Sequence, residues 1–290
     1  MFTVLRLLRR APLLAYFVLA YAASAVALAV IGWPRLDGTG GQPVASLVMF
    51  PVIVIAVGVA GLGMTAVADG KRGLRQLRVR MTHWRLGRWW LVLLVPPLGM
   101  LLVLTALQRF VSPSYAPHFL VFGIAAGLLA GLFEELGWTG FAFPRMSARL
   151  GALAGALVLG FLWALWHFPV VDSLGAASPH GSAWPLFFGA FAAVLVATRV
   201  LIAWLYVNTG SVLGAQLLHA TSTGSLVVLS PSAVSPEQEA LWYLAYAVLL
   251  WVVVVPVAAR FGATLTGTWR QPVPQVSTSP HTFDAGVASR

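Results

Sequence analysis

The stretch HFLVFGIAAGLLAGLFEELGWTGFA, residues 118–142, decides the fold class. A helix that crosses the hydrocarbon core of a bilayer needs about 20 mostly apolar residues, and this stretch supplies them. It also contains two adjacent glutamates, Glu134 and Glu135. Charged groups inside a membrane are energetically unfavourable and are retained mainly where they function. The stretch therefore predicts a transmembrane helix with a functional polar face.

The composition of the whole chain agrees with a membrane protein. Its 290 residues are 59% hydrophobic and 9% charged, with a mean hydropathy of +0.87. Soluble globular chains carry about 25% charged residues, and a soluble core of this length could not bury so much apolar surface. The chain has no cysteine, which excludes disulfides, thiolate metal sites and a cysteine nucleophile.

About eight apolar runs of spanning length predict an all-α, polytopic membrane helix bundle. They lie at residues 11–32, 44–68, 89–107, 118–142, 151–171, 184–207, 212–230 and 241–260. The first run follows a group of arginines but is longer than the apolar region of a signal peptide, so we expect a retained anchor. The runs divide the chain into N-terminal helices with a basic loop (1–117), a core (118–230), a last helix (231–260) and a tail expected to be disordered (261–290).

The basic residues predict the orientation of these spans, because Lys and Arg concentrate on the cytoplasmic side. With both termini cytoplasmic, the outer side receives only Arg35 and Arg109 among the basic residues, together with most of the acids. A seven-span arrangement would break this alternation. The net charge of +10 is therefore explained by topology, and we expect no nucleic-acid partner. The Arg-rich, Lys-poor composition favours the plasma membrane of a bacterium.

The segment GKRGLRQLRVRMTHWRLGRWW, residues 70–90, mixes basic side chains with Leu, Val and Trp. Such a mixture is typical of a segment that lies on a membrane surface, so residues 71–90 are expected to contact anionic lipid headgroups. The alternative is a loop whose positive charge only sets the topology.

Three further charged or titratable side chains stand out inside the predicted spans: His167, His219 and Arg199. Residues four apart share a helix face. This spacing pairs Trp138 with Glu134, Thr139 with Glu135, Trp163 with His167 and Thr223 with His219. Three spans can therefore bring a carboxylate and two imidazoles into one cavity.

Such a set can hydrolyse a bond without a covalent nucleophile. A glutamate shielded from water can act as a general base, and a histidine beside it can hold the same water. A second histidine can stabilise an oxyanion. The same side chains could instead ligate zinc. The structural alternatives are histidines that only pack, and an Arg199 that extends along its helix to the membrane surface.

These segments resemble the CPBP family of CAAX proteases and bacteriocin-processing (Abi) intramembrane proteases over roughly residues 70–230. The first family motif, two glutamates and an arginine four positions later, matches Glu134 and Glu135 but has Thr139 in place of the arginine. The second, an aromatic residue four positions before a histidine, matches Trp163 and His167, with Trp where Phe is usual. The third, a histidine followed four positions later by Asn or Asp, matches His219 but has Thr223.

The resemblance implies an intramembrane endopeptidase whose substrate is a membrane-associated peptide or protein. Glu134 would activate a water that His167 shares, Glu135 would support the site, and His219 would help to form the oxyanion pocket. No cofactor is expected, with zinc at Glu134, His167 and His219 as the less favoured alternative. Arg199 could supply the charge that Thr139 does not.

Two other functions remain alternatives to the protease. One is a catalytically impaired homologue that acts as a binding, immunity or scaffold protein, which the two threonines suggest. The other is a small proton-coupled transporter, although the sequence has no inverted repeat. The depth of His167 presents a difficulty, because it lies about 25 Å along its helix if that helix begins at residue 151, whereas Glu134 lies nearer the inner surface. Either residues 145–154 lie at the membrane interface and the span starts later, or a strong tilt closes the gap.

Overall fold

The computed structural model describes residues 2–31, 43–172 and 176–267, and within them it contains helices and no strand. The α-helices are α1 (Phe2–Arg10), α2 (Pro12–Ile31), α3 (Pro43–Met81), α4 (Val95–Phe110), α5 (Phe122–Gly137), α6 (Phe143–Leu150), α7 (Ala152–Val171), α8 (Trp184–Thr209), α9 (Val212–Val228) and α10 (Pro236–Phe261). A π-helical turn, Trp138–Ala142, joins α5 to α6. Short 3-10 helices lie at Gly87–Leu94, Pro113–Tyr115, Gly181–Ala183 and Gly262–Thr264. The predicted all-α class is confirmed.

Six of the expected spans are confirmed as helical segments long and apolar enough to cross a membrane. They are Pro12–Val30, Val48–Met81, Gly87–Phe110, Ala152–Val171, Gly181–Thr209 and Pro236–Thr264. The other two expected spans correspond to α5, with 16 residues, and α9, with 17 residues. The cytoplasmic placement of the termini and the division into four parts stay predictions, and residues 268–290 of the expected tail lie outside the described residues.

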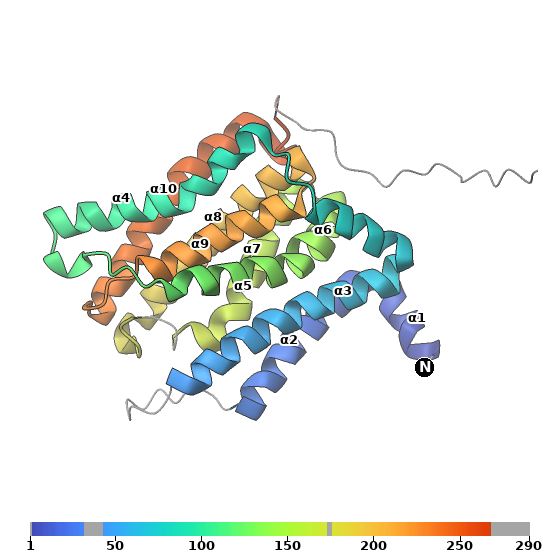
Figure 1. Ribbon diagram of the computed structural model, residues 1–290, viewed down its shortest axis with the longest axis horizontal. Helices are drawn as coiled ribbons and strands as arrows, with labels where there is room; N and C mark the ends of the chain where they lie inside the picture. The colour runs from blue at the N-terminus through green and yellow to red at the C-terminus, as the bar shows by residue number, and fades with distance from the viewer. Residues whose placement is uncertain (1, 32–42, 173–175, 268–290) are drawn as a thin grey trace, which may run out of the picture.

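The helices form a layered bundle (Figure 1). Helices α5, α7, α8 and α9 lie in the middle, with the α2–α3 pair on one side and the α4–α10 pair on the other. The shorter helices α5 and α9 pack against each other inside this arrangement. The central helices therefore carry the residues that are best shielded from the surroundings.

A row of glycines brings α5 and α9 unusually close. Gly123, Gly127 and Gly131 recur every fourth residue on the face of α5 that meets α9. A Cβ atom at Gly131 would lie 2.2 Å from the carbonyl oxygen of Gln216, so no larger residue fits there. Small residues allow this close approach of helix backbones in membrane proteins. The contact places the middle of α9 against the second half of α5.

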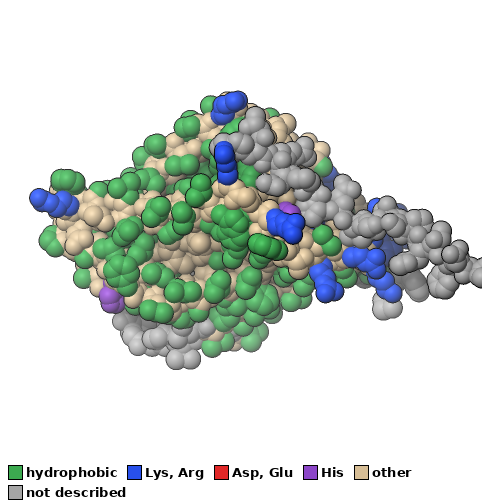
Figure 2. Space-filling model, turned by 45° about the horizontal axis from the view of Figure 1, so that its top comes forward, with side chains coloured by type: hydrophobic (Ala, Val, Ile, Leu, Met, Phe, Trp, Pro, Cys, Tyr) green, Lys and Arg blue, Asp and Glu red, His purple; other side chains and the backbone are tan. Residues whose placement is uncertain are grey.

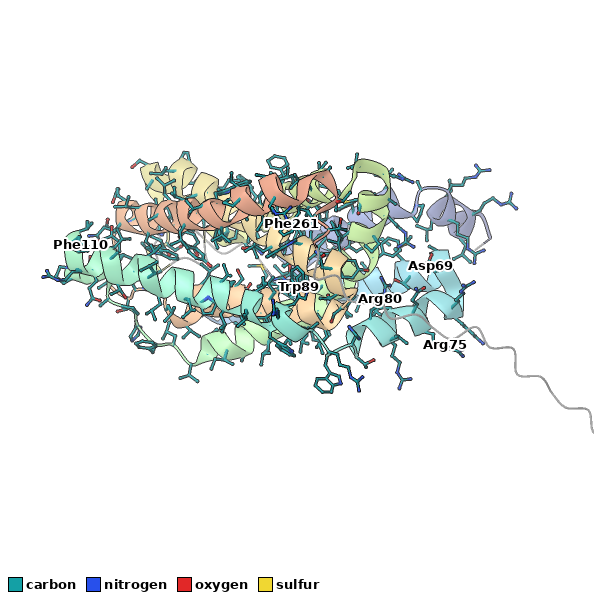
Figure 3. The ribbon with its side chains drawn as sticks, turned by 90° about the horizontal axis from the view of Figure 1, so that it is seen from above. Asp69, Arg75, Arg80, Trp89, Phe110 and Phe261 are labelled. Atoms are coloured by element: carbon teal, nitrogen blue, oxygen red, sulfur yellow. The ribbon has the colours of Figure 1, made fainter. Side chains whose placement is uncertain are left out.

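The surface of the bundle is largely apolar. Figure 2 shows hydrophobic side chains spread over one face, with the basic side chains toward its edges. Large apolar side chains such as Phe110, Val121 and Val30 are more than half exposed. Asp69 and Arg75 lie at one end of the molecule and Phe110 at the other (Figure 3). This distribution suits a protein whose sides face lipid and whose ends face water.

Candidate active site

The helical path around Gly151 removes the difficulty over the depth of His167. The sequence left open a later start of the span with His167 or a strong tilt, and in the structure α7 begins at Ala152. The π-helical turn and α6 continue the helix to Leu150, and the chain reverses at Gly151, which has a φ of 83°. Glu134 precedes Gly151 by nearly as many residues as His167 follows it. Helix α6 packs against α7, and Trp163, one turn before His167, donates a hydrogen bond to Glu134 at 2.8 Å, so Glu134 and His167 lie at similar depths.

Glu134 is held at one of its two carboxylate oxygens. Its side chain is buried, and Oε2 accepts hydrogen bonds from the indole Nε1 atoms of Trp138 at 3.0 Å and Trp163 at 2.8 Å. Among the described residues, no hydrogen bond reaches Oε1 of Glu134. This oxygen is therefore free to bind a water molecule.

Glu135 has hydrogen bonds at both of its oxygens. Arg199 donates to Oε1 at 2.8 Å and to Oε2 at 2.9 Å. His219 Nδ1 donates to Oε1 at 2.8 Å, and the hydroxyl of Thr139 donates to Oε2. The two adjacent glutamates therefore differ in their hydrogen bonding. Both oxygens of Glu135 are occupied by donors, whereas one oxygen of Glu134 is free.

Arg199 is an internal residue. Its side chain is 0% exposed, so the alternative that it extends along α8 to the membrane surface is wrong. Its guanidinium lies 4.5 Å from the centre of the Trp163 ring as well as against Glu135. A Cβ atom at Gly160 would lie 3.1 Å from Cβ of Arg199, so this glycine lets α7 approach α8 at the arginine. The expected charge partner of Glu135 thus comes from a neighbouring helix.

The two histidines lie on either side of Trp163. The ring of His219 is 4.8 Å from that of Trp163, and the ring of His167 is 5.6 Å away. Nδ1 of His167 lies 2.9 Å from the carbonyl oxygen of Trp163. A carbonyl can only accept, so Nδ1 donates, and Nε2 of the neutral ring is an acceptor. The structure thus brings together the four residues expected to be catalytic.

Thr223 is the expected supporting residue that the structure does not bring into this cluster. Its side chain is half-buried and makes no hydrogen bond among the described residues. The preceding Ser222 is buried instead, with its hydroxyl 3.4 Å from that of Thr198. The buried face of α9 therefore passes through His219 and Ser222, three residues apart rather than four.

Tyr16 on α2 adjoins the site and was not expected from the sequence. It is 0% exposed, its ring meets that of Trp138 edge to face at 5.5 Å, and its hydroxyl has no hydrogen-bond partner. The hydroxyl lies where a side chain on Gly137 would begin. The sequence carries no signal for this contact, because nothing in the local pattern relates residue 16 to residue 138.

A second polar cluster, at Asp172, His180 and Glu239, was also missed. His180 Nδ1 lies 2.5 Å from Asp172, and Nε2 lies 3.2 Å from Glu239. Burial of the ring disfavours its charged form, but the hydrogen bonds to Glu239 and Asp172 outweigh this effect and raise the pKa of His180. All three residues lie at the outer ends of predicted spans, which is the one signal that could have indicated their contact.

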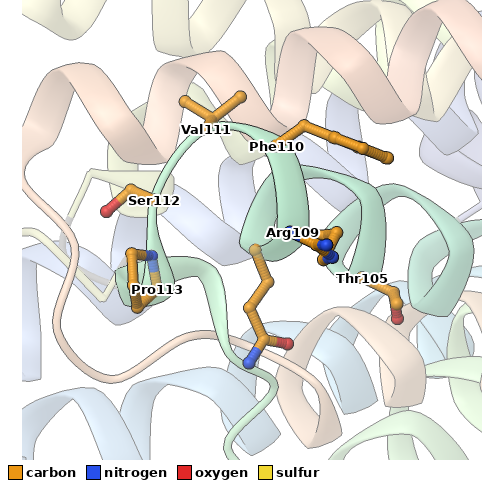
Figure 4. Close-up of a pocket in the computed structure, with 7 residues that line it drawn as sticks. Thr105, Arg109, Phe110, Val111, Ser112 and Pro113 are labelled. Atoms are coloured by element: carbon orange, nitrogen blue, oxygen red, sulfur yellow. The ribbon is translucent and has the colours of Figure 1, made fainter.

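Two further features bear on ligands. A surface hollow of about 580 Å³ at the end of α4 is lined by residues around Arg109 and Phe110, and it includes no residue of the Glu134 cluster (Figure 4).

Within the described ranges, no three His, Asp or Glu side chains are arranged to hold a metal ion. The absence of a cofactor stays a prediction.

The fold and the site define an all-α, multi-pass membrane protein with a buried Glu–His–Arg–Trp cluster. Residues 116–224 match the model of the type II CAAX prenyl endopeptidase Rce1-like family. The chain is also 46% identical over 44 residues to CAAX prenyl protease 2 of Methanococcus maripaludis. That alignment covers 15% of this chain and 16% of the relative. These findings support membership of the CPBP/CAAX protease family. Residues 116–224 contain every expected site residue.

Proposed function

We propose that this protein is an intramembrane endopeptidase that hydrolyses a membrane-associated peptide or protein with a water activated by Glu134. The observation that carries the proposal is the different hydrogen bonding of the Glu134 and Glu135 carboxylates. Glu134 is buried with Oε1 free, and the ring of Trp163, which donates to its other oxygen, lies against both His167 and His219, whereas Glu135 is fully hydrogen-bonded. A buried carboxylate with a free oxygen next to an imidazole is suited to general base catalysis. The site is proposed to lie in a bacterial plasma membrane.

The chemistry follows from the hydrogen-bonding capacity of each group. Oε1 of Glu134 takes a proton from the water as its oxygen bonds to the substrate carbonyl carbon, and Nε2 of His167 orients the same water. The carbonyl oxygen becomes an oxyanion, which His219 stabilises. When the C–N bond breaks, the proton on Glu134 passes to the leaving amine. Water is consumed, and the carboxylate is restored.

Glu135, Arg199 and Thr139 are proposed to hold His219 rather than to react. Glu135 accepts from Nδ1 of His219, which fixes the orientation of the ring. The position of Arg199 favours an active protease over an impaired homologue. Its guanidinium supplies Glu135 with the positive charge that Thr139, in the place of the motif arginine, does not supply. Hydrogen bonds link Glu135 to Arg199, His219 and Thr139 within the cluster.

Replacing His167 by alanine is expected to lower kcat by about 10²- to 10⁴-fold, because the water loses one of its two partners. The measurement uses the purified full chain in lipid nanodiscs and a library of quenched peptides. His118→Ala is the matched control, since His118 is an exposed histidine outside the cluster. Equal activity of the His167→Ala variant and the control would contradict the mechanism. A native chain that cleaves no peptide yet binds a membrane partner would indicate the impaired homologue.

The basic segment 71–90 is proposed to bind anionic lipid headgroups. Lys71, Arg72, Arg75 and Arg78 are exposed on the part of α3 that follows Gly70, where φ is 64°. Polar contacts join this segment to the bundle: the Arg80 guanidinium donates to the Tyr206 hydroxyl at 2.7 Å, and the Ser211 hydroxyl donates to the carbonyl oxygen of His83 at 2.6 Å. The exposed Trp84 and Trp90 lie in the same segment, as expected at a lipid boundary.

We expect the triple variant Arg72→Gln/Arg75→Gln/Arg78→Gln to retain less anionic lipid, because each basic residue near a charged surface contributes roughly 1 kcal/mol. The measurement is the ratio of phosphatidylglycerol to phosphatidylcholine that copurifies from mixed vesicles. Arg109→Gln, at the opposite end of the molecule, is the control. The proposal is wrong if the triple variant and the control retain the same ratio at low salt.

A further inference from the structure

Two tryptophans donate to one oxygen of Glu134. Nε1 of Trp138 lies 3.0 Å from Oε2, and Nε1 of Trp163 lies 2.8 Å from the same atom. An indole N–H can donate a hydrogen bond but cannot accept one, and a carboxylate oxygen offers about two lone-pair sites. Both sites of Oε2 are therefore occupied by donors. A proton that arrives at Glu134 is left with Oε1 as its position.

Neither indole is free to turn away from the glutamate. Trp138 is 0% exposed and is packed between Tyr16, at 5.5 Å, and Trp166, at 6.0 Å. Trp163 is 1% exposed and has its ring against Arg199, at 4.5 Å, and His219, at 4.8 Å. The donors come from different segments, the π-helical turn and α7. Together they fix both the position and the rotation of the carboxylate plane.

We propose that Trp138 and Trp163 are positioning residues that hold Oε2 of Glu134 and so assign proton exchange to Oε1 alone. The proposal rests on the proposed function for its catalytic consequence, but the hydrogen bonds themselves can be tested without activity. Rotation of a free carboxylate would exchange its two oxygens and move the base away from the water. The two indoles prevent this exchange, which keeps the reacting oxygen in one place throughout the cycle.

The simplest competing explanation is that the two indoles only fill space. Phenylalanine separates these explanations, because it keeps an aromatic ring at the position and removes the N–H donor. Trp242 provides a matched control, since it is also 0% exposed but its Nε1 has no hydrogen-bond partner among the residues that the structure describes. A Trp242→Phe variant therefore loses the same atoms without losing a contact to Glu134.

The kinetic test compares Trp163→Phe, Trp138→Phe and Trp242→Phe in the full chain. We expect either of the first two variants to lower kcat by up to roughly 10²-fold, the effect of a small misplacement of a catalytic group. KM should stay within about twofold, because substrate binding is not touched. The double variant Trp138→Phe/Trp163→Phe should lose more than the product of the single losses, since each single variant keeps one donor. Kinetics equal to those of Trp242→Phe would overturn the proposal.

A spectroscopic test keeps this proposal separate from the protease itself. The protein is labelled with ¹⁵N-tryptophan in detergent, and the indole N–H signals are assigned by the three Trp→Phe variants. Glu134→Leu, which removes the acceptor, is expected to shift the signals of Trp138 and Trp163 upfield and to leave that of Trp242 in place. Glu134→Gln should keep them, because its amide oxygen still accepts. If Glu134→Leu moves neither signal, the proposal is wrong, even where the native chain is an active protease.

Discussion

Replacing Glu134 by glutamine is expected to lower kcat for peptide cleavage by roughly 10³- to 10⁴-fold, the upper range for a general base. Glutamine has the shape of glutamate, so the variant should fold normally. Its amide oxygen satisfies the two indole donors at the position of Oε2. The amide nitrogen is then left at the position of Oε1, where it cannot accept a proton. The measurement is kcat in nanodiscs for a peptide that the native chain cleaves.

The matched control for this variant is Glu237→Gln. Glu237 is an exposed glutamate at the beginning of α10, and its side chain accepts a hydrogen bond from Ser235. We expect this control to cleave at the native rate. Cleavage by Glu134→Gln within tenfold of the control would show that Glu134 is not the base.

Replacing Arg199 by methionine is expected to lower the free energy of unfolding by about 3–5 kcal/mol, the usual effect of removing one partner of a buried ion pair. Arg199 and Glu135 are both 0% exposed and are joined by two hydrogen bonds. Methionine fills a similar volume but leaves the Glu135 carboxylate with only His219 and Thr139. The measurement is unfolding in mixed detergent micelles, followed by circular dichroism.

Two further variants test whether charge is the cause. Arg149→Met removes an exposed arginine from α6 and should change stability little. The double variant Arg199→Met/Glu135→Leu removes both charges and should be more stable than Arg199→Met alone, because no unpaired charge stays buried. If the double variant is less stable than the single variant, packing rather than charge explains the effect.

The helical class and most of the site follow from local features of the sequence. Hydropathy runs locate the helices, and a spacing of four residues correctly pairs Trp138 with Glu134 and Thr139 with Glu135. On α9 the same spacing predicted the wrong partner for His219, because the buried face contains Ser222 rather than Thr223. Hydropathy alone also could not distinguish spanning helices from the shorter α5 and α9.

The contacts between helices could not be derived in the same way. The sequence offered two positions for Arg199, internal or at the membrane surface, and only its packing at Gly160 separates them. The depth of His167 depended on α6, whose polar composition conceals that it continues the helix from Glu134. Tyr16 reaches the site through a tertiary contact with Trp138 from outside the matched segment 116–224.

Isotope labelling during a single turnover tests most directly whether water attacks the substrate while Glu134 serves as a base. Excess native protein is mixed with a cleavable peptide in H₂¹⁸O, and both the product and the protein fragment that contains Glu134 are weighed by mass spectrometry. Attack by water predicts one ¹⁸O atom in the new carboxyl terminus and none in Glu134. An unlabelled first product together with ¹⁸O in Glu134 would mean that the carboxylate itself had bonded to the substrate, which contradicts the mechanism.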